Sequence, residues 1–209
     1  MVKYLISVGC PKNTQDGYGY TALHVAVDPG SLAAAEALVE AGVDIDRPDN
    51  DNMPALVSAC KSNNVDMVKV LLAGGAQLRN PLKDRLISRM QMQKRSEIVK
   101  LLESDVGASK APAAAAQAVP ERLEVDDGTA AKITDIVLGS RDTAMLAQFL
   151  KENPIAVHAD TGLNQTPLHE AAGENKLSMC RVLLEHGAPV NARGYANRTA
   201  LHYAAYYNY

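Results

Sequence analysis

Apolar and small residues recur along the chain in short phrases that have the spacing of amphipathic helices. One six-residue phrase occurs three times, at Thr21, Thr166 and Thr199, and reads TALHVA, TPLHEA and TALHYA. A threonine before proline or alanine is a favourable start for a helix. Each copy therefore predicts a short helix in which the leucine fills the layer between neighbouring units. The alanine lets neighbouring helices approach closely.

A second phrase, rich in leucine and closed by glycine, follows the first. It occurs at 38–42 (LVEAG), 71–75 (LLAGG) and 183–187 (LLEHG) and predicts a second helix in each unit. Thr166 and Thr199 are 33 residues apart. The same step from Thr21 reaches Pro54, where PALVSA keeps the leucine and the alanine but loses the threonine and histidine. The units therefore repeat with a fixed period.

The position two residues before each helix start is occupied by glycine or asparagine. The four residues are Gly19, Asn52, Asn164 and Asn197. Both residue types tolerate a positive φ, so this position predicts a left-handed turn before each first helix.

A turn followed by two short helices, with a period of 33 residues and the TPLHxA phrase, resembles the ankyrin-repeat family. The resemblance covers most of the chain and is strongest at 14–80 and 160–209. It implies an all-α fold, an ankyrin-repeat solenoid of helix-turn-helix units with short β-turn or loop connections. It also implies that His24, His169 and His202 satisfy backbone groups at the turns and do not bind a metal.

The repeats are predicted to form two blocks. The first block, 1–105, contains a half repeat, repeats at 14–46 and 47–80, and a degenerate capping repeat at 81–105. Residues 106–128 form a linker or long loop that is first rich in Ala and Pro and then acidic. The second block, 129–209, contains an atypical repeat at 129–160, a repeat at 161–193 and a truncated repeat at 194–209.

Two arrangements of these blocks are open, either two short arrays joined by a tether or one array with a long loop between repeats. Four basic residues in the capping repeat, Arg85, Arg89, Lys94 and Arg95, favour two blocks because they predict a solvated face. A nuclear-import or nucleic-acid patch is the alternative interpretation. Residues 2–9 match the second helix of a repeat and the sequence ends after a first helix. We therefore expect unpaired helices at both ends and a fragment of a longer repeat protein.

The composition of the chain limits the classes of partner and the cellular location that we expect. A formal net charge of -3 gives no general attraction to nucleic acid or to an anionic membrane. Cys10, Cys60 and Cys180 are too far apart in sequence for a metal knuckle, and their odd number does not suggest a disulfide framework. This favours an intracellular, cytoplasmic location, with the nucleus as the alternative. No apolar stretch approaches the roughly 20 residues that cross a bilayer, so no membrane insertion is expected.

Catalytic and cofactor motifs are incomplete. His169 and Glu170 begin an HExxH motif, but Gly173 stands where the second histidine is required. Gly17, Gly19 and Ala22 form a GxGxxA sequence without the preceding strand that a dinucleotide site needs. The sequence therefore predicts a non-catalytic chain with no cofactor, no metal and no small-molecule substrate.

In an ankyrin-like stack, turn tips and first helices line a concave face that the family uses for protein partners. We therefore expect a protein partner, and tyrosine and arginine are favoured as contact residues. The candidate contacts are Tyr18, Tyr20, Asp28, Asp51, Met53, Lys61, Leu163, Gln165, Glu174, Tyr195, Arg198, Tyr206 and Tyr207. The alternative function is a targeting or regulatory segment of a larger enzyme or channel, such as a kinase, ubiquitin ligase or acyltransferase.

Overall fold

The computed structural model describes residues 1–104 and 123–207, and every regular element in these two ranges is helical. Most of the predicted linker, 106–122, lies outside the described residues. The all-α prediction is confirmed.

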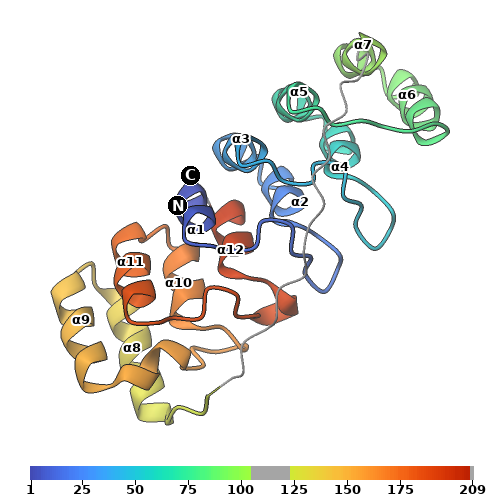
Figure 1. The fold of residues 1–209 in the computed structure, drawn as a ribbon. Helices are drawn as coiled ribbons and strands as arrows, with labels where there is room; N and C mark the ends of the chain where they lie inside the picture. The colour runs from blue at the N-terminus through green and yellow to red at the C-terminus, as the bar shows by residue number, and fades with distance from the viewer. Residues whose placement is uncertain (105–122, 208–209) are drawn as a thin grey trace.

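The helices form two parallel rows (Figure 1). The first row contains α8 (Asp127–Gly139), α10 (Pro167–Gly173), α12 (Ala200–Tyr206), α2 (Ala22–Val27), α4 (Ala55–Lys61) and α6 (Leu82–Met92). The second row contains α9 (Thr143–Glu152), α11 (Leu177–Glu185), α1 (Val2–Ser7), α3 (Leu32–Glu40), α5 (Val65–Ala73) and α7 (Ser96–Ser104). Two short 3-10 helices, η1 (Pro154–His158) and η2 (Tyr195–Asn197), lie in the connections.

The repeated phrases form the helices for the reasons that the sequence suggests. Thr21, Thr166 and Thr199 are the N-cap residues of α2, α10 and α12, in extended backbone conformation. The leucine and the alanine of each phrase are buried. The core positions are Leu23, Leu56, Leu168 and Leu201, with Ala26, Ala59, Ala171 and Ala204. Aliphatic layers between helices therefore hold the stack together.

The turns before the first helices are left-handed, as predicted. The φ angle is 80° at Gly19, 59° at Asn52, 64° at Asn164 and 60° at Asn197. A side chain at Gly19 would also collide with the next turn, because an added Cβ would lie 2.5 Å from the backbone nitrogen of Asn50. The turns of neighbouring repeats therefore approach each other closely.

The N-terminal helix and the last helix together complete one repeat. α12 has the position of a first helix and α1 that of a second helix, and the two pack against each other. α12 also packs against α2 and α10, and α1 packs against α3. The row therefore runs from α8 and α9, through the pair formed by α12 and α1, to α6 and α7 (Figure 1).

This order corrects one expectation from the sequence, that the helices at the two ends of the chain are unpaired. The helices expected to be unpaired cover each other, because Val2 and Leu5 of α1 and Leu201 of α12 are all buried. The second block stacks before the first block and not after it. The division of the chain at 105 and 129 remains a prediction.

The degenerate repeat of α6 and α7 ends the row (Figure 1). Arg85, Arg89 and Lys94 are exposed there. Arg95 has a structural role, because its Nη1 donates hydrogen bonds to the carbonyl oxygens of Cys60 and Lys61 at 2.6 and 2.7 Å. The solvated face therefore contains three of the four basic residues.

Candidate functional site

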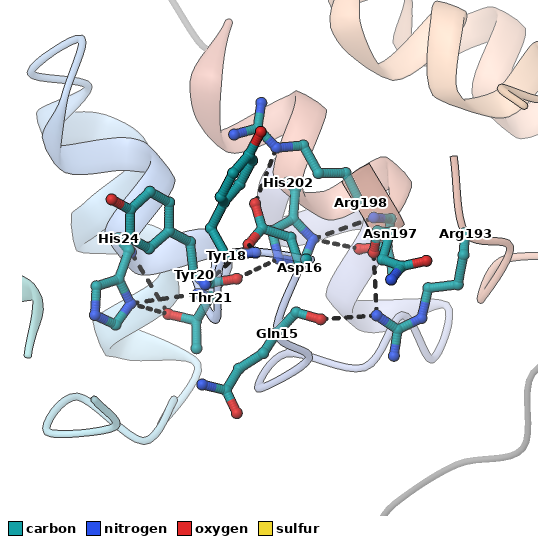
Figure 2. Close-up of polar contacts among 12 residues, drawn as sticks. Gln15, Asp16, Tyr18, Tyr20, Thr21, His24, Arg193, Asn197, Arg198 and His202 are labelled. Carbon is teal, nitrogen blue, oxygen red and sulfur yellow. Dashed lines mark hydrogen bonds and ion pairs between the residues drawn. The ribbon is translucent and has the colours of Figure 1, made fainter. Parts of the chain in front are cut away.

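The place where the two blocks meet, which we call the junction, consists of α12 and its turn (193–198) against α1, α2 and their turn (15–20). Its contacts recur between covalently consecutive repeats in the same register. Gln15 Nε2 donates to the carbonyl oxygens of Gly19 and Pro48, at 2.8 and 2.9 Å. Across the junction, Arg193 Nη1 donates to the equivalent carbonyls of Asn197 and Gln15, at 3.0 and 2.8 Å (Figure 2). The junction therefore continues the stack.

The histidines repeat the same relation. His24 Nε2 lies 3.0 Å from the carbonyl oxygen of Met53, in the following turn. His202 Nε2 lies 2.9 Å from the carbonyl oxygen of Tyr20 across the junction (Figure 2). His169 Nε2 lies 3.1 Å from the carbonyl oxygen of Arg198. The first helices α2, α10 and α12 are thus each fixed to the next turn, whether or not the chain is continuous between them.

The hydrogen-bond partners define the state of these imidazoles. Because a carbonyl oxygen only accepts, Nε2 must carry the proton. On the other side of the ring, Nδ1 of His169 accepts from the backbone N–H of Thr166 at 3.0 Å, and Nδ1 of His202 from that of Thr199 at 3.2 Å. Burial lowers the pKa of both His169 and His202 to about 4. Both rings are therefore neutral near pH 7.

One ion pair is specific to the junction. Arg198 Nε lies 3.1 Å from Asp16 Oδ2, and the side chains are 26% and 0% exposed. The other carboxylate oxygen of Asp16 accepts from the backbone N–H groups of Tyr18 and Tyr20, both at 2.9 Å. The sequence predicts Arg198 as a partner contact, and in the structure its guanidinium also bridges the two blocks.

Tyrosines gather on the two repeats that meet at the junction. Four are exposed: Tyr18 (55%), Tyr195 (54%), Tyr207 (43%) and Tyr206 (40%). We call these four residues the tyrosine face. Tyr18 and Tyr195 come from the turns, and Tyr206 and Tyr207 come from the end of α12.

Neighbouring aromatic rings support the tyrosine face. The rings of Tyr206 and Tyr207 meet edge to face, with centroids 4.7 Å apart. Tyr18 lies 6.1 Å from Tyr20, which stacks on His24 at 5.7 Å and is half-buried. Tyr20 therefore positions Tyr18 and offers less surface of its own.

Carboxylates surround this region. Asp28, Asp51 and Glu174 are exposed. Burial raises the pKa of the Tyr20 hydroxyl, and four surrounding aspartates raise it further. The four are Asp49, Asp28, Asp51 and Asp16. The half-buried Glu170 also has a raised pKa, because burial outweighs the hydrogen bond from Thr161 Oγ1. Negative charge therefore lies beside Tyr20.

The remaining candidate contacts divide by exposure. Lys61 and Leu163 are exposed, as are the three carboxylates above. Met53 and Gln165 are half-buried. Sequence reasoning missed Gln15, Asp16 and Arg193. Gln15 and Arg193 share one position in the 33-residue frame, and this correspondence could have revealed their common role.

A family profile described as ankyrin repeats (three copies) matches residues 1–81 and 137–209, which is more than half of the chain. The chain belongs to the ankyrin-repeat family. It is therefore a repeat domain of the protein–protein interaction class.

Ankyrin proteins among the curated relatives match parts of the chain. It is 43% identical over 61 residues to the B-cell lymphoma 3 protein homolog of Mus musculus. The aligned segment covers 29% of this chain and 14% of that protein. It is 28% identical over 126 residues to the ankyrin repeat and KH domain-containing protein mask-1 of Caenorhabditis elegans. The aligned segment covers 58% of this chain and 5% of that protein. The chain thus matches only small parts of these relatives.

Two solved ankyrin-repeat domains are similar in structure. The human ASB11 domain has a TM-score of 0.41 at 24% identity, with 97% of this chain and 85% of that chain covered. The domain of Bcl-3 has a TM-score of 0.43 at 21% identity, with 97% and 86% covered.

Ankyrin-type packing leaves little reactive chemistry in the described residues. Within 1–104 and 123–207, no three histidine, cysteine, aspartate or glutamate side chains come together as metal ligands would. No helix in these ranges is both long and apolar enough to cross a membrane. Burial raises the pKa of the Cys10, Cys60 and Cys180 thiols to about 12. These thiols therefore stay protonated and unreactive near neutral pH.

Proposed function

We propose that this chain is a non-catalytic scaffold that binds a partner protein through the tyrosine face. The observation that carries the proposal is the exposure of Tyr18, Tyr195, Tyr206 and Tyr207 on the two repeats that meet at the junction. Tyrosine has a large apolar ring, a polar tip and few rotatable bonds, so it contributes much binding energy for little loss of entropy. The rigid turns below it add preorganisation.

The rim of the face suggests the charge of the partner. Asp28, Asp51 and Glu174 are exposed around the tyrosines, whereas the nearby guanidinium groups of Arg193 and Arg198 are engaged in hydrogen bonds within the protein. A partner with basic residues at its edge fits this arrangement. Rim charges of this kind chiefly increase the association rate and make it depend on salt.

Removing the tyrosine rings is expected to weaken partner capture strongly. The variant Tyr18→Ala/Tyr206→Ala/Tyr207→Ala should lose at least about 10-fold of the binding of each specific partner, since a single hot-spot truncation costs about 2 kcal/mol or more. The measurement is quantitative mass spectrometry of proteins retained by the immobilised chain, followed by titration of the retained partner.

A matched control removes exposed apolar side chains elsewhere. Met92, Leu138 and Met145 are exposed on α6, α8 and α9, and their triple alanine variant should bind as the original chain does. Circular dichroism checks that both variants remain folded. Equal capture by the two folded variants would contradict the assignment of the tyrosine face.

A further inference from the structure

The repeat at the α6 end of the row has no turn before its first helix. α6 begins at Leu82, whereas a step of 33 residues from the start of α4 reaches Ser88. The residues in register with the turn 48–53 therefore belong to the start of α6. Figure 1 shows long loops before α2 and α4, whereas the described connection 74–81 runs directly from α5 to α6. The turn before α4 is thus the last turn at this end of the row.

The sequence of the preceding repeat agrees with this ending. His24 Nε2 holds the turn that follows it at the carbonyl oxygen of Met53, at 3.0 Å. Gln15 Nε2 holds the same turn at the carbonyl oxygen of Pro48, at 2.9 Å. One repeat further on, the residues in register are Val57 and Pro48 itself, whose side chains have no hydrogen-bond donor. This repeat therefore lacks both side chains that would hold a further turn.

The last turn nevertheless keeps the shape of a turn that receives a neighbour. Asp16 N–H donates to the carbonyl oxygen of Tyr20 at 2.8 Å and closes the turn before α2. Asp49 N–H donates in the same way to the carbonyl oxygen of Met53, at 3.0 Å, in the turn before α4. The outer edge of the last turn therefore has the form that receives the next turn elsewhere in the stack.

One backbone acceptor on that edge has no donor from a following turn. Between the two preceding turns, Asn50 N–H donates to the carbonyl oxygen of Tyr18 at 3.2 Å. One repeat further on, the groups in register are Lys83 N–H and the carbonyl oxygen of Asp51. Lys83 lies within α6, and its N–H donates to the carbonyl oxygen of Arg79 instead, at 3.2 Å. The Asp51 carbonyl therefore remains available to a donor from another molecule.

A cavity lies beside the last turn and is lined by residues from 44–54 and 75–82. Its volume is about 560 Å³, within the range of about 300 to 1,000 Å³ that ligand pockets have. Ile45, Leu78 and Leu82 line it, and these three side chains are half-buried and pack against the core. An aliphatic side chain of a partner would therefore find an apolar surface there.

The charges that line the cavity are balanced. Asp44 and Asp46 contribute two carboxylates, and Arg47 and Arg79 contribute two guanidinium groups. A nucleic acid requires an excess of positive charge, which this lining lacks. An uncharged stretch of polypeptide fits better, because its backbone can bind the Asp51 carbonyl and a side chain can enter the cavity.

We propose that an extended segment of a partner protein binds here in place of the missing turn. One backbone N–H of the segment donates to the Asp51 carbonyl oxygen, and an aliphatic side chain beside it enters the cavity. Pairing of this kind obtains affinity from main-chain hydrogen bonds and specificity from the side-chain pocket. The site shares no residue with the tyrosine face, so its test is independent of the proposed function.

Peptide selection on the full chain tests the proposal. A library of short peptides displayed on phage is selected on the immobilised chain, and the enriched peptides are synthesised and titrated. The variant Gln77→Trp fills the cavity. It keeps the hydrogen bond to Asp46 Oδ1, at 2.8 Å, because the backbone N–H of Gln77 makes that bond. We expect the enriched peptides to share an aliphatic residue and to bind this variant at least about 10-fold more weakly.

A fluorescent reporter locates the bound peptide. The chain contains no tryptophan, so Arg79→Trp places a single one at the exposed rim of the cavity. Lys132→Trp, exposed on α8 at the other end of the row, is the matched control. The bound peptide should shift the emission of Arg79→Trp to shorter wavelength and protect it from acrylamide quenching. It should leave the emission of Lys132→Trp unchanged.

Circular dichroism checks that the variants are folded, and if Gln77→Trp is unfolded, the two reporters decide alone. Three results would overturn the proposal: no peptide is enriched, the enriched peptides bind the folded Gln77→Trp variant as they bind the original chain, or the two reporters respond equally. Peptides that lose binding to the Tyr18→Ala/Tyr206→Ala/Tyr207→Ala variant but not to Gln77→Trp would support the tyrosine face and contradict this site.

Discussion

Lowering the pH from 7.5 to 5 should reduce the free energy of unfolding by about 4 kcal/mol through His169 and His202 alone. Burial lowers the pKa of both imidazoles to about 4 in the folded chain, whereas an unfolded histidine has a pKa of about 6.5. Between these values the unfolded chain binds more protons, so stability is complete above about pH 6.5 and is lost as the pH falls to about 4.

The physical cause of this loss is visible at the rings. A proton on Nδ1 of His202 would face the backbone N–H of Thr199, which now donates to that nitrogen. His24 has a lowered pKa for the same main reason, its burial, and adds to the effect. A typical domain has a stability of about 5 to 15 kcal/mol, so a loss of this size removes a large part of the stability before exposed carboxylates titrate.

Urea unfolding, monitored by circular dichroism at pH 7.5 and pH 5, measures the loss in the free energy of unfolding. The variant His169→Gln/His202→Gln should be less stable at pH 7.5 but should lose far less stability on acidification. The half-buried His158 and His186 lie outside the repeated phrase, so His158→Gln/His186→Gln serves as the matched control. An unchanged pH dependence in the His169/His202 variant would show that other groups cause the acid transition.

Replacing Asp16 by alanine should cost about 3 to 4 kcal/mol of stability, because it removes one partner of a buried ion pair and two hydrogen bonds to a charged acceptor. The substitution leaves the Arg198 guanidinium, only 26% exposed, without its carboxylate. It also removes the acceptor of the Tyr18 and Tyr20 N–H groups. The junction should then open before the rest of the stack unfolds.

Asp49 is the matched control for Asp16 in the next repeat. It accepts hydrogen bonds from the N–H groups of Asp51 and Met53, both at 2.9 Å, in the same type of turn. In the described part of the chain it has no counterpart of Arg198 within ion-pair distance. Asp49→Ala should therefore cost only about 1 to 2 kcal/mol. Equal losses of the two variants in urea unfolding would mean that the ion pair contributes nothing to the junction.

Features that depend on neighbouring residues were predictable from the sequence. The caps at Thr21, Thr166 and Thr199 follow from residues within one helical turn. The left-handed turn at Gly19 and its equivalents follows from the conformational preference of one residue type. The role of the three histidines, which hold the turns, was implied by the ankyrin resemblance, and their hydrogen bonds in the structure confirm it.

The contacts at the junction could not be predicted from the sequence in this way. His202 and Tyr20 are 182 residues apart, and a frame that counts along the chain does not bring them together. The sequence showed a second helix without a first at 2–9 and a first helix without a second at 194–209. Recognising that these two halves fit requires the shapes of their buried faces. For the same reason the ion pair of Arg198 is hidden, since the sequence does not show that Asp16 lies opposite it.

The order of the row determines how such an array would grow during evolution. Both ends of the row, at α7 and at α8, are encoded in the interior of the gene. Duplication of a repeat at an end of the solenoid would therefore be an insertion between the codons for Ser104 and Asp127. Any residues joined to the chain before α1 or after α12 would instead lie at the centre of the stack, where they would compete with the pairing of these two helices.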